Sequence, residues 1–170
     1  MKNIYFLGLL VVLGEMCFAA DPAEGFWFSI DEKTGRVTAG WEVYQQDGKL
    51  FGKPLSTAEH APDLKAVLCK ESYPGFPVPG KVREMPILGT PWIFGLTLEK
   101  TGHWSGGNVI NVLDGSIYRC KIIYRPADGK RFLTDTLEMR GEIGFGIGRS
   151  QFWQKTTRQQ ALSLKANPSA

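Results

Sequence analysis

A glycine-rich run near the end of the chain is the stretch whose residue types could do chemistry. It holds Gly141, Gly144, Gly146 and Gly148, followed by Arg149 and Ser150. Glycine-rich loops can cradle phosphate because their backbone N–H groups approach the ligand closely. A dinucleotide site needs G-x-G-x-x-G between a strand and a helix, and a P-loop needs Gly-Lys-Ser/Thr. Here the spacing is G-x-G-x-G, Arg replaces Lys and no helix pattern follows, so the run indicates a β-turn and a last strand.

The other reactive residue types are too scattered to predict a catalytic or metal site. His60 and His103 are the only histidines, whereas a zinc site needs several nitrogen or sulfur ligands. Ser105 is close to His103 in sequence, but the segment lacks the G-x-S-x-G pattern of a nucleophile elbow. We therefore expect no catalytic residue, no metal and no cofactor, and hence a protein that is not an enzyme.

The first residues have the pattern of a signal peptide. Lys2 precedes an apolar run over 4–13, which is shorter than the roughly 20 residues needed to span a bilayer. A small-x-small pattern ends at Ala19, so we expect residues 1–20 to be a signal peptide and the mature chain to be periplasmic or secreted. The alternative is lipoprotein processing at Cys17, which Met16 disfavours because a small residue is expected before that cysteine. No other apolar run is long enough to span a membrane.

The composition favours one domain built from short strands. A chain of 170 residues fits a single domain, and 20 glycines and 10 prolines suit strands joined by turns. The net charge of +3 is mild and does not imply a nucleic-acid partner.

Alternation of apolar and polar residues predicts about eight antiparallel strands. They are expected at 25–30, 36–44, 49–53, 92–98, 108–112, 116–124, 131–139 and 149–155, with turns such as Asp47-Gly48 and 101–107 between them. Because no helix alternates with these strands, an up-and-down barrel or a sandwich fits. A barrel of about eight strands has room for side chains or one small ligand.

The connection over 54–91 differs from the rest of the chain. It is rich in proline and glycine, which exclude regular helix or inner strand over much of its length. A short helix is expected within 62–70. Long connections in small domains are often lids, which makes Tyr73, Phe76 and Val78 candidate lid residues. Equally, the segment could simply cross one end of the fold.

The first and last strands carry a recognisable pair of motifs. A G-x-W formed by Gly25 and Trp27, together with Arg149 near the end, resembles the signature of the calycin superfamily, which includes lipocalins and fatty-acid-binding barrels. In that resemblance the arginine lies across the tryptophan ring and closes one end of the barrel, as cation–π stacking allows. The alternative function for Arg149 is to grip an anionic ligand.

The chain also resembles DUF2147, a family of exported bacterial proteins of unknown function. The resemblance rests on Gly25-Phe26-Trp27, Met85-Pro86-Ile87-Leu88, Trp104-Ser105-Gly106-Gly107, the run from Leu113 to Lys121, and the runs from Met139 to Gly144 and from Gly148 to Trp153. It implies a calycin-like barrel over 21–155 and brings no established activity. Some members carry Cys-x-x-Cys in the long connection, where this chain has Cys69-Lys70-Glu71-Ser72. That leaves Cys69 free or paired with Cys120, and a disulfide is possible because an exported chain permits one.

Together these features predict an all-β, eight-stranded, lipocalin-like barrel that binds a small apolar or amphipathic ligand. The candidate pocket residues are Trp41, Tyr118, Ile122, Tyr124, Leu133 and Leu137. The alternative is a ligand-free, filled barrel that acts as an envelope or secreted interaction module through its surface and basic C-terminus. Residues 156–170 are polar and expected to form a flexible tail. The oligomeric state is left open.

Overall fold

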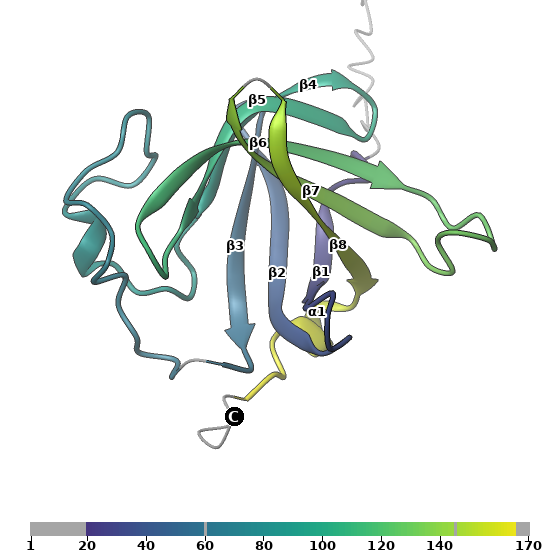
Figure 1. Ribbon diagram of the computed structural model, residues 1–170, viewed down its shortest axis with the longest axis horizontal. Helices are drawn as coiled ribbons and strands as arrows, with labels where there is room; N and C mark the ends of the chain where they lie inside the picture. Colours follow the sequence, from purple (N-terminus) through teal and green to yellow (C-terminus); the bar gives the residue numbers. More distant parts are fainter. Residues whose placement is uncertain (1–19, 60, 145, 166–170) are drawn as a thin grey trace, which may run out of the picture.

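Eight antiparallel strands close into a barrel in which each strand pairs with its sequence neighbour and β8 pairs with β1 (Figure 1). The computed structural model describes residues 20–59, 61–144 and 146–165. The strands are β1 (Gly25–Ile30), β2 (Val37–Gln46), β3 (Lys49–Thr57), β4 (Ile93–Lys100), β5 (His103–Asn111), β6 (Ser116–Arg125), β7 (Thr136–Gly144) and β8 (Ile147–Thr156). A 3-10 turn, η1 (Val82–Glu84), and a single-turn helix, α1 (Arg158–Ala161), complete the secondary structure of these described residues. The predicted all-β barrel is confirmed.

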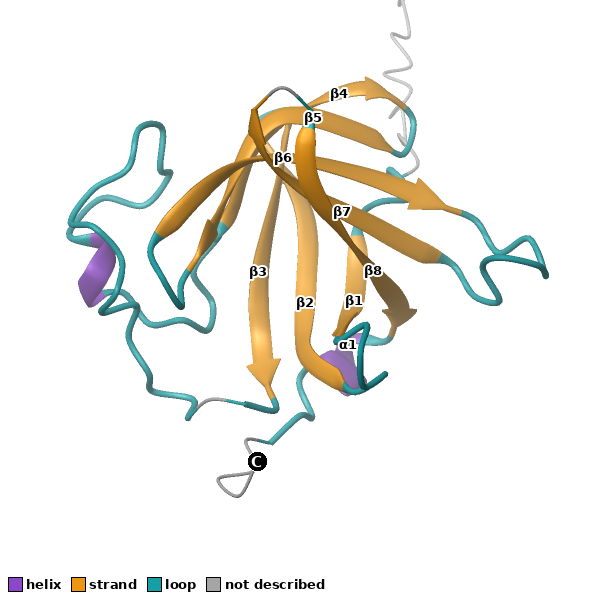
Figure 2. Cartoon of the chain, in the orientation of Figure 1, coloured by secondary structure: helices purple, strands orange, loops and turns teal. Residues whose placement is uncertain are grey.

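Short turns join β2 to β3, β4 to β5 and β5 to β6, whereas longer segments join β3 to β4 and β6 to β7 (Figure 2). Asp47 and Gly48 link β2 to β3 with φ values of 50° and 72°, the left-handed conformation of a two-residue hairpin. The glycine-rich run forms the end of β7, the β7–β8 turn and the start of β8, as its spacing predicted. Gly144 and Gly146 have φ values of 121° and 76°, which side chains rarely adopt. These glycines therefore shape a turn.

Several strand boundaries differ from those predicted, and the differences in β3, β5 and β7 have clear causes. β3 continues through Pro54 to Thr57, because Pro54 pairs with Trp41 where the register of β2 shifts and its missing N–H is tolerated. β5 begins at His103, since the turn before it is confined to 101–102. β7 begins at Thr136 and not at residue 131, because Asp128 instead accepts backbone hydrogen bonds that fold 126–135 into a loop.

The barrel interior is filled at one end, which we call the closed end. Its core consists of Trp27, Val43, Leu50, Ile93, Leu96, Trp104, Ile122, Leu137 and Trp153, with the smaller Ala23 and Cys120 beside them. The segment before β1 covers this end. There Asp21 accepts hydrogen bonds from Trp104 Nε1 (3.0 Å) and Gly102 N (2.8 Å), while Ala23 O accepts one from Trp27 Nε1 (3.1 Å). The chain entering the barrel thus seals the closed end.

A second apolar cluster lies outside the barrel wall. It joins the connection between β3 and β4 to side chains of β4 and β5, and comprises Ala66, Cys69, Tyr73, Val82, Ile87, Trp92, Phe94 and Ile110. Figure 1 shows this connection as the irregular segment beside β3. The helix expected over 62–70 does not form; turns occupy that stretch and the helical turn is η1 instead.

The segment after β8 packs against the barrel over part of its length. Thr157 caps α1 by accepting a hydrogen bond from Gln160 N. Ala161 is fully buried, and its carbonyl accepts a 2.6 Å bond from Ser56 Oγ. The prediction of a flexible tail over 156–170 is therefore wrong for the docked turn, and residues 166–170 lie outside the described residues. Across the described ranges, neither helical element nor any other helix is long and apolar enough to cross a membrane. Residues 1–19 of the predicted signal peptide lie outside the described residues.

Candidate ligand-binding cavity

A cavity of about 600 Å³ opens at the end of the barrel opposite the closed end. We call this end the mouth. It is surrounded by the β1–β2 loop, the β3–β4 connection, the β5–β6 turn and the β7–β8 turn. The volume falls within the range of known small-molecule sites. The barrel is therefore solid at one end and open at the other.

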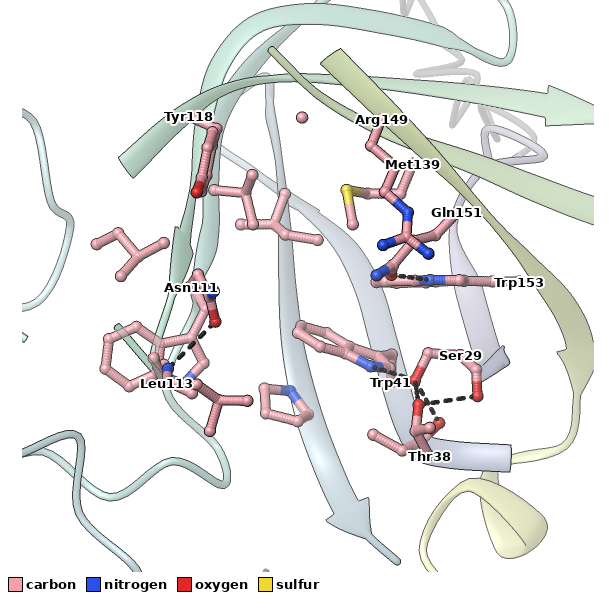
Figure 3. Close-up of a pocket in the computed structure, with 18 of the residues that line it drawn as sticks. Ser29, Thr38, Trp41, Asn111, Leu113, Tyr118, Met139, Arg149, Gln151 and Trp153 are labelled. Carbon is pink, nitrogen blue, oxygen red and sulfur yellow. Dashed lines mark hydrogen bonds between the residues drawn. The ribbon is translucent and has the colours of Figure 1, made fainter. Parts of the chain in front are cut away.

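Aromatic and aliphatic side chains form most of the cavity wall. Trp41 of β2 stacks on Trp153 of β8, with ring centroids 4.8 Å apart and planes 29° apart. Val109 of β5 and Met139 of β7 continue this wall, and Figure 3 shows Met139 above the two indoles. The wall can accept an apolar body because contact with these side chains removes apolar surface from water.

Several polar groups of the lining already bond to one another. Ser29 Oγ accepts a 3.2 Å hydrogen bond from Trp41 Nε1 and lies 2.8 Å from Thr38 Oγ1. Asn111 donates to Asp114 Oδ2 and accepts from Leu113 N. Figure 3 shows both groups at the edge of the cavity. These contacts hold the wall in shape and leave these side chains little capacity for a ligand.

A row of polar side chains on β8 lies nearer the mouth. Arg149, Gln151 and Trp153 alternate along the strand and all line the cavity. In Figure 3 they project into it from one strand, with Tyr118 on the opposite side. Gln151 Oε1 accepts a 3.1 Å bond from Trp153 Nε1, which fixes the orientation of the carboxamide. Arg149 contacts Glu32 of the β1–β2 loop at 3.6 Å.

The structure places two of the six candidate pocket residues on the cavity wall: Trp41 and Tyr118. Ile122 and Leu137 are fully buried in the closed-end core, so they face inward but lie below the cavity. Tyr124 packs edge-on against Trp27, and burial raises its pKa to about 12. Leu133 is 80% exposed in the β6–β7 loop and does not line the cavity. The alternation of apolar and polar residues indicated which side chains face inward, but not whether they lie at the cavity or in the closed-end core.

Lys155, and not Arg149, lies across Trp27. Its Nζ atom is 4.3 Å from the ring centroid and donates a 2.9 Å hydrogen bond to Glu24 O. Burial lowers the pKa of Lys155, an effect that Asp135 partly opposes. Gly25 leaves room for this lysine, since a Cβ there would sit 2.6 Å from Nζ. The predicted closure by Arg149 is therefore wrong, because the β1–β8 register pairs Trp27 with Lys155.

The candidate lid residues do not cover the mouth. Tyr73 is buried in the outer cluster, where its hydroxyl donates to Gly115 O at 2.7 Å. Phe76 packs against Trp92 and Phe94, with ring centroids 5.8 and 5.3 Å away. Val78 is half-buried and is not part of the cavity wall. The connection instead contributes Glu59, Ile87 and Trp92 to the cavity wall.

Cys69 and Cys120 are both free and buried. Cys69 belongs to the cluster outside the barrel, whereas Cys120 belongs to the core inside it. The barrel wall thus separates them, and the possible disulfide does not form. Burial raises the pKa of both thiols.

The described part of the chain brings together no group of three His, Cys, Asp or Glu side chains that could hold a metal ion. His103 begins β5. The other histidine, His60, lies outside the described residues.

Comparison with known proteins identifies two similarities. Residues 25–155 match the model of a family described as "Uncharacterized protein conserved in bacteria (DUF2147)". The fold is similar to a solved protein from the human pathogen Helicobacter pylori that belongs to the lipocalin family. That likeness has a TM-score of 0.63 at 18% sequence identity, and covers 85% of this chain and 91% of the other. At this identity it establishes the fold alone. A search of curated proteins finds no match.

Proposed function

The chain belongs to the DUF2147 family, and from that premise we propose that it is an exported, non-enzymatic protein that binds a small apolar or amphipathic ligand in the mouth of its barrel. The observation that carries the proposal is the open cavity of about 600 Å³ above a solid core. A barrel that served only as a scaffold would gain stability by filling this space, since empty apolar volume costs packing energy.

The composition of the wall supports an apolar or amphipathic ligand. The stacked pair Trp41 and Trp153 offers two large rings, and Val109 and Met139 offer aliphatic surface. Small-molecule sites typically combine such a wall with a few placed polar groups. Here the polar groups are Arg149 and Gln151, near the opening. A ligand with an apolar body and one polar end matches both regions.

Export agrees with the beginning of the folded barrel. Among the described residues, Asp21, directly after the predicted signal peptide, is the first whose side chain seals the closed end. Removal of residues 1–20 would thus leave the sealing contacts in place. The cavity wall also supports a role in binding without catalysis, because its polar side chains mainly form hydrogen bonds to other protein groups.

The alternative, a filled barrel that acts through its surface and C-terminus, receives less support. The cavity is open, and the segment after β8 is anchored at Ala161 by Ser56. A docked segment is less available to a partner than a flexible one.

Native mass spectrometry of protein purified from its own host tests the proposal. A variant that fills the cavity is available in Gly141→Leu, because a Cβ at residue 141 points toward Tyr118 and Val109 at distances of 3.5 and 3.7 Å. Gln154→Leu, on the exposed outer face of β8, adds the same side chain elsewhere and serves as the control. We expect a bound small molecule on the wild type and on the control, but not on Gly141→Leu. No bound mass on the wild type, or equal binding by all three proteins, would count against the proposal.

A further inference from the structure

We propose that the ligand carries an anionic group, held at the mouth by Arg149 and Gln151. The inference rests on the proposed binding function and names the chemical class of its ligand. The geometry that points to it is the placement of Arg149 on the inward face of β8, at the open end of the barrel. Because Lys155 closes the barrel on Trp27, Arg149 has no part in that closure.

Apart from the Glu59 carboxylate and the Tyr118 hydroxyl, a group that can both donate and accept, the side-chain hydrogen-bonding capacity that remains in the described cavity wall is mainly that of donors. Ser29, Thr38 and Asn111 are engaged with neighbouring protein groups. Gln151 uses its oxygen to accept from Trp153 Nε1, and an indole N–H can only donate, so the NH₂ end of the carboxamide stays available. Two donor side chains, Arg149 and Gln151, thus project from one strand edge toward the same space (Figure 3).

The contact between Arg149 and Glu32 leaves the guanidinium exchangeable. The two groups are 3.6 Å apart, and their side chains are 71% and 40% exposed. Exposed pairs of this kind contribute little to stability. A guanidinium has five donors and binds a carboxylate with two parallel bonds. An anionic ligand can therefore replace Glu32, whose carboxylate is an internal competitor for the same cation.

The remaining charged side chain of the described lining does not alter this assignment. Glu59 lies in the connection after β3, whereas Arg149 and Gln151 are two residues apart on β8. A cationic ligand would have the single carboxylate of Glu59 there. An anionic ligand has a guanidinium and an amide N–H together, directly beside the Trp41–Trp153 stack. The ligand that fits is a monoanionic amphiphile, with its head at the mouth and its body against the indoles.

Three probes with the same ten-carbon chain and different heads test this assignment: decanoate, decanol and decyltrimethylammonium. The two charged probes are used below their critical micelle concentrations, and decanol below its solubility limit, to displace the neutral fluorophore N-phenylnaphthylamine. We expect wild-type protein to bind decanoate most tightly. Arg149→Gln should weaken the affinity for decanoate about tenfold, because a charge-assisted hydrogen-bonded pair is lost. The affinity for decanol should change by less than about twofold. Glu32→Gln should strengthen the affinity for decanoate about threefold, because the exposed ion pair between Glu32 and Arg149 no longer competes with the ligand.

A matched charge change on the outer wall controls for net charge. Arg119 is exposed on β6 between the inward-facing Tyr118 and Cys120, so Arg119→Gln should leave all three affinities unchanged. If decanol and decanoate bind equally, if Arg149→Gln weakens both alike, or if decyltrimethylammonium binds best, the anionic assignment fails while the binding function stands. If neither N-phenylnaphthylamine nor any of the three probes binds the wild type, the proposed function fails, and the anionic assignment with it.

Discussion

Lys155 and Trp27 face one another across the pairing of β8 with β1, with the ammonium 4.3 Å from the centre of the indole. Arg149 is on the same inward face of β8, six residues earlier, roughly 20 Å away along an extended strand. One strand therefore places a cation at each end of the barrel. Lys155 lies over the ring at the closed end, and Arg149 stands at the mouth.

Replacement of Lys155 by Met should therefore cost stability. The change removes the cation–π contact and the hydrogen bond to Glu24 O. We expect the free energy of unfolding in urea to fall by about 1 to 2 kcal/mol. Arg149→Gln removes a cation from the same strand face and should cost less than about 0.5 kcal/mol. A larger loss from Arg149→Gln than from Lys155→Met would contradict this division of roles.

The packing of α1 on the barrel can be tested at Gly40. A Cβ there would lie 2.0 Å from the carbonyl oxygen of Ala161, too close for both to stay in place. Gly40→Ala should thus lower the free energy of unfolding by about 2 kcal/mol in the full chain. In a chain that ends at Thr156 the same substitution should have little further effect. Equal costs in the two backgrounds, measured as a double-mutant cycle, would show that α1 does not pack there.

The outer face of β7 gives stability a dependence on pH. Burial raises the pKa of Glu138, but hydrogen bonds from Arg125 and Ser150 outweigh it, so the pKa lies below the ordinary value of 4.5. A carboxyl group whose pKa is lower in the folded state than in the unfolded state stabilises the fold fully at pH values above its unfolded-state pKa. This stabilisation is lost as the pH falls through the folded-state pKa. At neutral pH, Glu138→Gln should reduce the free energy of unfolding by about 1 kcal/mol. Below pH 4.5 the difference from the wild type should narrow; a constant difference in urea titrations would refute the assignment.

The two buried thiols should remain reduced and unreactive in the folded protein. Cys69 and Cys120 lie on opposite sides of the barrel wall, and burial keeps both protonated by raising their pKa. In protein that starts at Asp21, we expect slow alkylation of both thiols in native buffer and rapid alkylation of both in denaturant. Intact mass after alkylation under non-reducing denaturing conditions measures this. Failure of both to react until a reductant is added would reveal a disulfide.

The strand topology could be predicted from the sequence, and so could some of the residues at the closed end. Gly25 and Trp27 stood where the motif placed them, and the spacing of the glycines correctly predicted the β7–β8 turn. The choice between Arg149 and Lys155 could not be made, because both are on one face of β8 and only the register with β1 selects Lys155. Strand register depends on partners distant in sequence.

The candidate site was only partly predictable for a related reason. The alternation of β6 identified the inward face that Tyr118 and Ile122 share, but Tyr118 lines the cavity and Ile122 fills the core. The position of an inward-facing residue between the mouth and the closed end depends on how its strand is aligned with the neighbouring strands. Leu133 continued the pattern of β7 in sequence, yet Asp128 folds its segment into a loop. Gln151 was missed, although its two-residue spacing from Arg149 and Trp153 was a usable signal.

The most direct test of the central claim is a fluorescence titration with N-phenylnaphthylamine, a neutral apolar probe. Wild-type protein and Gly141→Leu would be compared after circular dichroism and urea unfolding have shown that both are folded. The cavity account predicts saturable, one-site binding to the wild type, displaced by decanol and abolished in Gly141→Leu, because the leucine occupies the space next to Tyr118 and Val109. Binding of equal affinity and stoichiometry in both proteins would place the probe elsewhere and contradict the claim.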